Sequence, residues 1–219
     1  DLEEIIDVAR RADDLLRGVL PPNEGNQVRP RPGLELGAPE IRIIPDPHPM
    51  NPRVECDTLG TMICWHPRYN LGDKHSYRNN QELFIALAGY EDEVPFDLEA
   101  IEKRALRNAI ILPLYLYDHS GLTMNTTGFS CPWDSGQVGY VFVTLEDART
   151  EFSAKRLSSK MRERALDILR AEVDVYDAYL RGDFCGFEIM GDDDEVIDSC
   201  WGFSTTADCL TEARSFLAA

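Results

Sequence analysis

The sequence predicts an α+β fold with a mixed, largely antiparallel sheet flanked by helices, preceded by an N-terminal helix on a proline-rich linker. Apolar residues recur with a helical period in several segments, most clearly at residues 157–180. Two β-type runs within residues 184–203 are separated by turn residues and not by a helix. Helical and strand patterns do not alternate regularly along the chain, which argues against a parallel βαβ sheet.

The first 39 residues differ in composition from the rest of the chain. Residues 1–20 predict an amphipathic helix that ends at two prolines. Its apolar positions are Leu2, Ile5, Ile6, Ala9, Ala12, Leu15, Leu16 and Val19. Residues 21–39, rich in Pro, Gly and Asn, predict an extended linker. We expect the helix to pack either on residues 40–219, which are predicted to form a single α+β domain, or against a partner or a second copy.

The start of this domain predicts two short strands and a short helix. The strands are expected at residues 40–44 and 60–65, and four prolines in residues 45–53 argue against regular structure between them. Residues 80–88 predict a helix, because Asn79 can accept hydrogen bonds from its first turn.

A second helix is expected to begin at Asp97 and to run to about Asn108. Its predicted inward residues are Leu98, Ile101, Ala105 and Leu106. Residues 109–117 then predict a strand that is apolar on both faces and therefore central in the sheet. Pro113 lacks the N–H that a ladder needs, so a bulge is expected there. Its partner strand is predicted at residues 139–145.

The C-terminal part of the chain begins with the long helix of residues 157–180, which Gly182 is expected to end. Its stripe comprises Leu157, Met161, Ala165, Ile168, Leu169, Val173, Tyr176 and Leu180. The remaining predicted elements are a hairpin of residues 184–190 and 196–203 and a last helix, capped by Thr205 or Thr206, that runs through Leu217.

The composition is strongly acidic, with 22 basic and 39 acidic residues and a net charge of -17. Such a charge disfavours direct binding to nucleic acid, because phosphates repel it. It serves solubility, and it can also attract a basic surface on another protein. The 6 cysteines include no CxxC pair, which is typical of reduced thiols. Without a long apolar run or a signal-peptide pattern, we expect a cytoplasmic protein with no membrane partner.

The polar residues between the two central strands form the first candidate site. Cys131 could act as a nucleophile with His119 or His66 as its base, and Asp134 or Asp118 could orient the imidazole. The spacing matches no known nucleophile signature. The alternative interpretation is that Cys131 packs while Asp134 makes turn hydrogen bonds.

A metal site is the second hypothesis considered. Its ligands would come from Cys64, His66, His75, His119 and Cys131. Cys64 and His66 stand two residues apart, but no second close pair completes the spacing of a structural zinc site. We therefore predict neither a metal nor another cofactor.

Two acidic segments form the third candidate site. They comprise Asp192, Asp193, Asp194, Glu195 and Asp198 in one segment, and Glu91, Asp92 and Glu93 in the other. No Lys or Arg occurs between residues 182 and 213, whereas residues 155–170 carry six basic and two acidic side chains. A solvated hairpin turn explains the first run without any function. The alternative is an acidic face that mimics nucleic acid and occupies a basic groove on a partner.

Three stretches resemble one family of uncharacterised proteins from bacteriophages and other mobile elements. They read NPRVECDTLGTMICWHPRYNLGDKH (residues 51–75), LPLYLYDHSGLTMNTTGFSCPWDSGQVGYVFV (residues 112–143) and DSCWGF (residues 198–203). The resemblance implies a phage or mobile-element protein in a bacterial cytoplasm, and it assigns no catalytic residue. Small acidic proteins of such origin are often inhibitors of host defence.

The leading hypothesis is therefore an acidic protein that binds and inhibits a host nucleic-acid-binding or defence protein. One alternative is a hydrolase or transferase that uses Cys131. Another is a structural or assembly protein that forms a homo-oligomer through residues 1–20.

Overall fold

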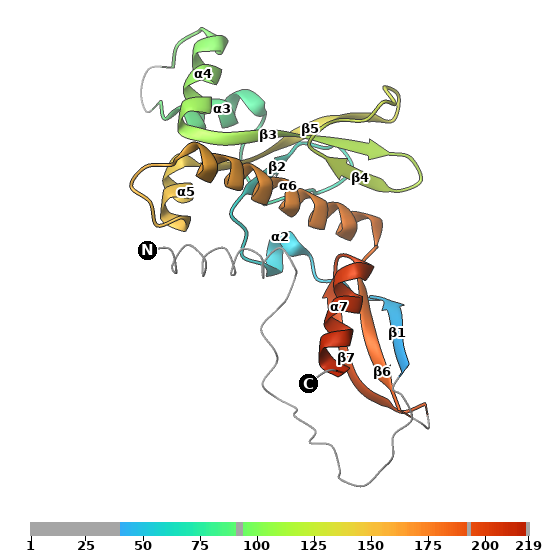
Figure 1. The fold of residues 1–219 in the computed structure, drawn as a ribbon. Coiled ribbons are helices and arrows are strands. Elements are labelled where there is room, and N and C mark those ends of the chain that lie inside the picture. Colours follow the sequence, from blue (N-terminus) through green and yellow to red (C-terminus); the bar gives the residue numbers. More distant parts are fainter. Residues whose placement is uncertain (1–39, 91–93, 192–193, 218–219) are drawn as a thin grey trace.

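The computed structural model describes residues 40–90, 94–191 and 194–217. The predicted N-terminal helix (residues 1–20) and linker (residues 21–39) lie outside these ranges. The chain forms two antiparallel sheets, each with its own helices (Figure 1). We call residues 50–182 the large lobe, and residues 40–49 with 183–217 the small lobe. The predicted α+β class, with largely antiparallel strands flanked by helices, is confirmed.

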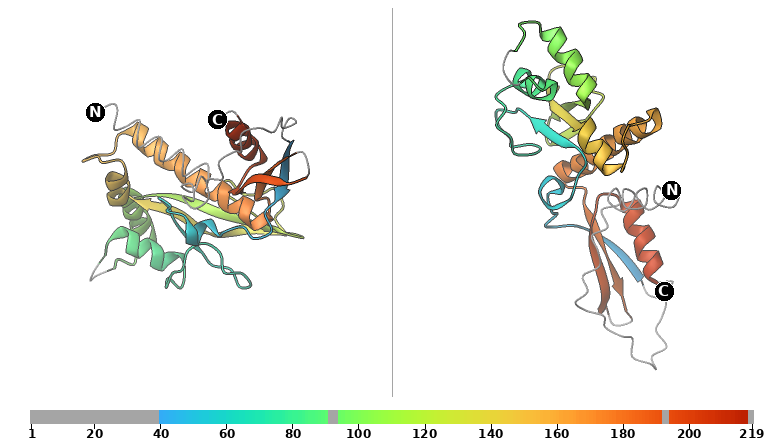
Figure 2. Two further views of the ribbon diagram at one scale, coloured as in Figure 1. Left: turned by 90° about the horizontal axis from the view of Figure 1, so that it is seen from below. Right: turned by 90° about the vertical axis from the view of Figure 1, so that its left-hand side faces the viewer.

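The large lobe contains a four-stranded sheet in the order β2-β5-β3-β4. Its strands are β2 (Thr61–Cys64), β3 (Ala109–Asp118), β4 (Leu122–Asn125) and β5 (Ser135–Thr144). Its helices are α2 (Pro52–Glu55), α3 (Asn80–Ala88), α4 (Leu98–Asn108), α5 (Leu145–Glu151) and α6 (Ser159–Arg181). The long helix α6 runs along one face of the sheet, and α3 and α4 lie on the other side (Figures 1 and 2).

Strand alternation divides the core of the large lobe between these two layers. Met62, Val141 and Val143 pack with the buried stripe of α6. Their neighbours Ile63 and Phe142 point the other way and pack with Leu83 of α3. Side chains of a strand alternate between its faces, so a sheet covered on both sides must be apolar at consecutive positions. This explains the continuous apolar runs of the sequence.

The small lobe is a three-stranded sheet in the order β1-β6-β7 with one helix (Figure 2). Its elements are β1 (Glu40–Pro45), β6 (Cys185–Met190), β7 (Val196–Phe203) and α7 (Thr206–Leu217). Phe187, Ile189 and Phe203 pack with Cys209 and Ala213 of α7. Strand β1 pairs with β6, about 145 positions later, in the register Ile43↔Phe187. The small lobe is thus closed by the two ends of the described chain.

The helix ends follow the predicted capping residues. The Asn79 side chain accepts from the N–H of Glu82 at 3.0 Å, and Asp97 accepts from the first turn of α4. Gly182 ends α6 with φ 72°, a left-handed conformation that glycine adopts without strain. Thr205 accepts from the N–H of Asp208 at the start of α7. Local side-chain chemistry was therefore sufficient to place these boundaries.

Four expectations need correction. Leu98 and Leu106 are 59% and 50% exposed, because α4 turns only Ile101 and Ala105 inward. The proline-rich segment 45–53 is not wholly irregular, because helix α2 begins at Pro52. Proline is tolerated there, since the backbone N–H groups of the first helical turn have no partner within the helix.

The other two corrections concern the central strands. The register shift in β3 lies between Leu114 and Tyr115, one residue after Pro113, which itself pairs with Tyr140. Strand β5 begins at Ser135, four residues before the predicted start, because the polar residues pair with the far end of β3.

Candidate functional sites

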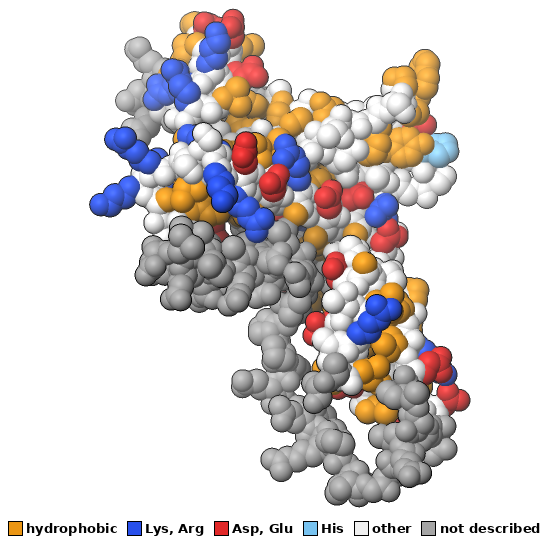
Figure 3. Space-filling view, in the orientation of Figure 1, with side chains coloured by type: hydrophobic (Ala, Val, Ile, Leu, Met, Phe, Trp, Pro, Cys, Tyr) orange, Lys and Arg blue, Asp and Glu red, His pale blue; other side chains and the backbone are white. Residues whose placement is uncertain are grey.

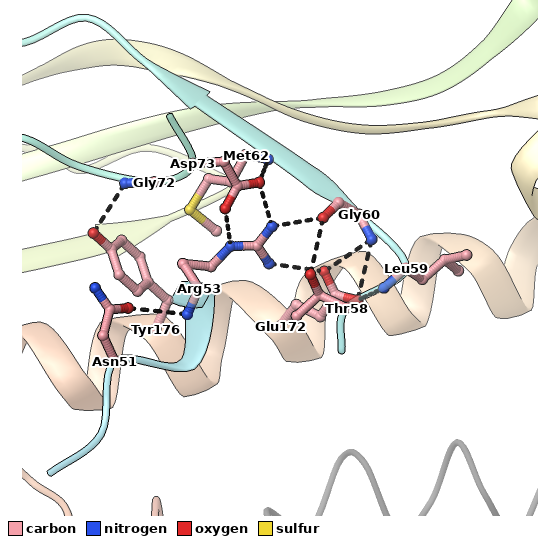
Figure 4. A network of polar contacts seen from close by, with 10 residues as sticks. All are labelled: Asn51, Arg53, Thr58, Leu59, Gly60, Met62, Gly72, Asp73, Glu172 and Tyr176. Carbon is pink, nitrogen blue, oxygen red and sulfur yellow. Dashed lines mark hydrogen bonds and ion pairs between the residues drawn. The ribbon is translucent and has the colours of Figure 1, made fainter. Parts of the chain in front are cut away.

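A buried ion network joins α2, β2 and α6 (Figure 4). The Arg53 side chain is 1% exposed. Its Nε and Nη2 donate to the two carboxylate oxygens of Asp73 at 2.9 and 2.6 Å. Nη2 also donates to the carbonyl of Gly60 at 2.6 Å, and Nη1 donates to Glu172 of α6 at 3.2 Å. Arg53 thus has a bidentate carboxylate partner and a second carboxylate in contact.

The two carboxylates are themselves held by backbone donors. Glu172 accepts from the N–H of Leu59 at 2.6 Å and from the N–H of Gly60. Asp73 accepts from the N–H of Met62 at 2.7 Å. Burial raises the pKa of Glu172 above its ordinary value, against the opposing charge of Arg53. Burial lowers the pKa of Arg53, but the hydrogen bonds and charges of Asp73 and Glu172 together outweigh this effect and leave the pKa raised.

This network explains much of the motif in residues 51–75. Asn51 caps α2 by accepting from the N–H of Arg53 at 2.9 Å. At Gly60 a β-carbon would lie 2.4 Å from Leu169 Cδ2 and 2.8 Å from the Glu172 carboxylate, so any larger residue would force these side chains of α6 to shift. The polar groups of the motif therefore form a structural joint that fixes β2 to α6. Sequence reasoning missed it because Glu172 lies far outside the motif.

A cavity of about 460 Å³ lies beside this joint, between the two lobes. It is lined by Met50, Pro52, Arg53, Cys56, Asp57, Thr58, Leu59, Thr61, Asp147, Thr150, Glu151, Ile168, Glu172, Val175, Phe184, Gly202 and Ser204. No sequence pattern predicts this cavity, because its walls come from α2, α5, α6 and the small lobe.

The predicted residues Cys131, His119 and Asp134 lie together at the far end of the large-lobe sheet. The Asp134 Oδ2 atom is 3.4 Å from His119 Nδ1 and accepts from Cys131 Sγ at 3.7 Å. The carboxylate is therefore shared by the thiol and the imidazole. In a nucleophilic triad the imidazole stands between the thiol and the carboxylate. Trp133, in the same loop, is 91% exposed.

No described side-chain hydrogen bond joins the other predicted chemistry residues to this cluster, although the backbone N–H of Asp118 donates to the carbonyl of Asp134 at 2.8 Å. His66 Nδ1 accepts from the N–H groups of Arg68 and Tyr69 at 3.3 Å each, which shapes its own loop. Asp118 pairs with Arg68. His75 Nε2 lies 3.0 Å from the carbonyl of Cys64.

The described residues contain no group of three or more His, Cys, Asp or Glu side chains that could hold a metal ion. Burial raises the pKa of Cys64 to about 12, so its thiol stays protonated near neutral pH. Burial and the neighbouring Cys185 likewise raise the pKa of Cys209 to about 12. Every cysteine in the described ranges is a free thiol.

Charge is divided unequally between the lobes. The described residues of the small lobe include nine acidic and two basic side chains. Those of the large lobe include 17 acidic and 15 basic side chains. The predicted acids Asp194 and Glu195 are exposed, and Asp194 pairs with Arg42 at 2.8 Å. Asp198 is half-buried and accepts from the N–H of Ser199. The predicted residues Asp192, Asp193, Glu91, Asp92 and Glu93 lie outside the described ranges.

The basic side chains gather at the opposite end of the molecule. Lys155, Arg156 and Lys160 are exposed around the turn from α5 to α6. Figure 3 shows Lys and Arg side chains clustered at this end of the large lobe. Several basic side chains are therefore grouped at this end of the large lobe, while the small lobe carries the larger excess of acids.

Comparisons with protein-family models, with curated proteins and with solved structures found no match to this chain. Within the described ranges, no helix combines the length and the apolar character needed to cross a membrane.

Proposed function

We propose that this protein is an acidic, non-enzymatic inhibitor whose small lobe binds the basic surface of a nucleic-acid-binding or defence protein in a bacterial host. In this proposal its carboxylates occupy positions that nucleic-acid phosphates would otherwise take. The phage or mobile-element origin and the cytoplasmic setting rest on the resemblance of residues 51–75, 112–143 and 198–203.

One observation carries the proposal: the small lobe has nine described acids against two arginines, while the large lobe is nearly balanced. If solubility alone explained the charge, the acids would not need to be concentrated in the smaller of the two lobes. A surface of one sign steers a partner of opposite sign and makes association fast and salt-sensitive.

The surface also carries apolar side chains suited to a protein partner. Val196, Ile197 and Trp201 of β7 are 46%, 50% and 39% exposed. Exposed aromatic and aliphatic residues within a charged rim are typical of protein interfaces. They would add contacts that duplex nucleic acid does not offer.

The test compares two variants in which four acids are neutralised. The small-lobe variant carries Glu188→Gln, Asp194→Asn, Glu195→Gln and Asp198→Asn. The matched control carries Glu99→Gln, Glu102→Gln, Glu163→Gln and Asp167→Asn, all exposed in the large lobe. Each protein is immobilised and exposed to bacterial lysate, and bound proteins are eluted with duplex DNA.

We expect the wild type and the control to retain proteins that DNA elutes, and the small-lobe variant to lose them. Retention should fall steeply between about 50 mM and about 200 mM salt, as ion-pair contacts are screened. If DNA elutes nothing at low salt, or if both variants bind equally, the proposal is wrong.

A second candidate function is a hydrolase or transferase that uses Cys131. The observation in its favour is the Asp134 carboxylate, which lies within 3.4 Å of His119 and 3.7 Å of the Cys131 thiol. A small rearrangement of this exposed loop would be needed to place the imidazole against the sulfur.

The alkylation rate of Cys131 by iodoacetamide tests this candidate. An activated thiol should react at least tenfold faster than the exposed Cys200, and His119→Phe should abolish the difference. Equal rates for the two thiols would exclude an activated Cys131.

A further inference from the structure

The cavity between the lobes has an apolar floor that no described element covers. Leu59, Ile168, Val175 and Phe184 line it, together with Met50. Of these, Ile168 and Val175 lie on α6 with Glu172 between them, one helical face beside the buried stripe that packs on the sheet. Ile168 and Phe184 are already buried, whereas Met50 is 45% exposed. A cavity of about 460 Å³ has room for several side chains of an occupant that presents an apolar face.

The rim of the cavity defines the charge of that occupant. Asp57, Asp147 and Glu151 line it and are exposed. The only cation among the lining residues is Arg53, whose donors already serve Asp73, Glu172 and Gly60. The occupant should thus present apolar side chains flanked by basic ones.

We propose that residues 1–20 of the same chain dock in this cavity as an amphipathic helix. The stripe from Leu2 to Val19 would cover the apolar floor. On a helical projection, Arg10 and Arg17 border this stripe on one side and Arg11 on the other. The acids Glu3, Asp7 and Asp14 fall opposite the stripe, whereas Glu4 lies beside Arg11 and Asp13 falls within the stripe. The three arginines would therefore face the acidic rim, and three of the six acids of this segment would face water.

The tether is long enough for this docking. Residues 21–39 can extend to about 60 Å when fully stretched. The chain enters β1 at Glu40, and β1 spans about 20 Å before reaching the lobe junction at Pro45, where it pairs with Cys185. Docking on the same chain therefore requires only part of the reach of the linker.

A docked helix would have two structural consequences. It would contact both α6 and Phe184 of the small lobe, and so restrict motion between the lobes. It would also cover the small part of Glu172 that remains exposed, since the side chain of this residue is 10% exposed.

Cross-linking in the full-length chain tests the proposal. Cys56 lines the cavity and is exposed, so it can serve as a native attachment point. In a background with Cys131→Ser and Cys200→Ser, Ala9→Cys places a thiol at the centre of the stripe. Asp14→Cys, on the opposite face, is the matched control. A short bismaleimide is added at low protein concentration, and the products are mapped by mass spectrometry.

We expect a Cys56 cross-link to position 9 within one chain, at least fivefold more abundant than the cross-link to position 14. A link found only between two chains would overturn the proposal in favour of self-association through residues 1–20. Equal yields at the two positions would also overturn it.

A second measurement avoids the cysteine background. In the otherwise wild-type protein, Leu16→Glu should release the helix and speed the alkylation of Cys56 severalfold, while Asp14→Asn should leave the rate unchanged. An unchanged rate in Leu16→Glu would contradict docking over Cys56.

Discussion

The two lobes use the same architecture, an antiparallel sheet covered by helices, but they treat charge in opposite ways. The large lobe buries Arg53 with Asp73 and Glu172, and its charges nearly balance. The small lobe has a core of apolar side chains and cysteines under one helix. Its Arg42–Asp194 pair is 41% and 80% exposed.

This difference means that charge contributes to the structure of the large lobe but not to that of the small lobe. A buried guanidinium with fixed carboxylate partners is costly to misplace, so the network orients α2, β2 and α6 relative to one another. Exposed carboxylates without cations repel each other and contribute little to stability. The buried charges of the large lobe therefore hold its elements together, whereas the surplus charge of the small lobe lies on its surface.

The largest expected effect comes from removing the buried cation. Arg53→Leu leaves two buried carboxylates without a counter-charge, which should lower the free energy of unfolding by about 3–5 kcal/mol. Denaturation in urea measures the loss. The control is Arg170→Leu, whose exposed pair with Asp167 should be worth less than about 1 kcal/mol. Equal losses in the two variants would mean that the network is not a structural joint.

The independence of the lobes can be tested next. Ile189 is 3% exposed in the small-lobe core, so Ile189→Ala should cost about 3 kcal/mol. Fluorescence in single-tryptophan proteins follows each lobe, with Trp201 reporting the small lobe and Trp65 the large one. We expect the Trp201 midpoint to fall further than the Trp65 midpoint, because the lobes have separate hydrophobic clusters.

Leu169→Ala in the large lobe is the reciprocal control and should reverse this order. If both reporters shift together in both variants, the two lobes unfold as one cooperative unit.

Two glycines of β5 provide a smaller and well-matched test. At Gly139 a β-carbon would lie 1.9 Å from the carbonyl oxygen of Ile63, whereas at Gly136 nothing lies within 4 Å. Gly139→Ala must push β2 away and should destabilise the large lobe by about 1–3 kcal/mol. Gly136→Ala should change stability by less than about 0.5 kcal/mol. Thermal unfolding distinguishes the two, and a reversed order would contradict the β2–β5 register.

The smallest expected effect is a pH dependence that arises from Glu172. Burial raises its pKa above the ordinary value of 4.5, so the folded protein holds this proton more tightly than the unfolded chain. Its contribution to stability is therefore complete below 4.5 and is lost as the pH rises through the raised value. Urea unfolding over a pH series measures this slope.

Glu172→Gln cannot titrate, so the stability of the wild type relative to this variant should fall as the pH rises through that window. The exposed Glu163→Gln, on the same helix, should leave the slope unchanged. A relative stability that rises with pH would show that the carboxylate is favoured in the fold.

Much of the fold could be predicted because its signals are local. Asn79, Asp97 and Gly182 end helices through contacts within four residues of themselves. Sequence patterns do not predict burial correctly where it depends on elements that are distant in the sequence. Leu98 and Leu106 fit an amphipathic pattern, yet of these four residues only Ile101 and Ala105 are buried. The clustering of Cys131, His119 and Asp134 was anticipated as a possibility, but the position of the carboxylate between the other two groups was not.

The sequence by itself determined the fold class, most element boundaries and the strong negative charge, because these depend on local periodicity, capping chemistry and composition. Only the tertiary structure decided that Arg53 meets Glu172, that β1 pairs with β6 and that the acids of residues 183–212 share a lobe with almost no cations. Such pairings join residues more than 100 positions apart, and no periodic pattern records which distant partners will meet.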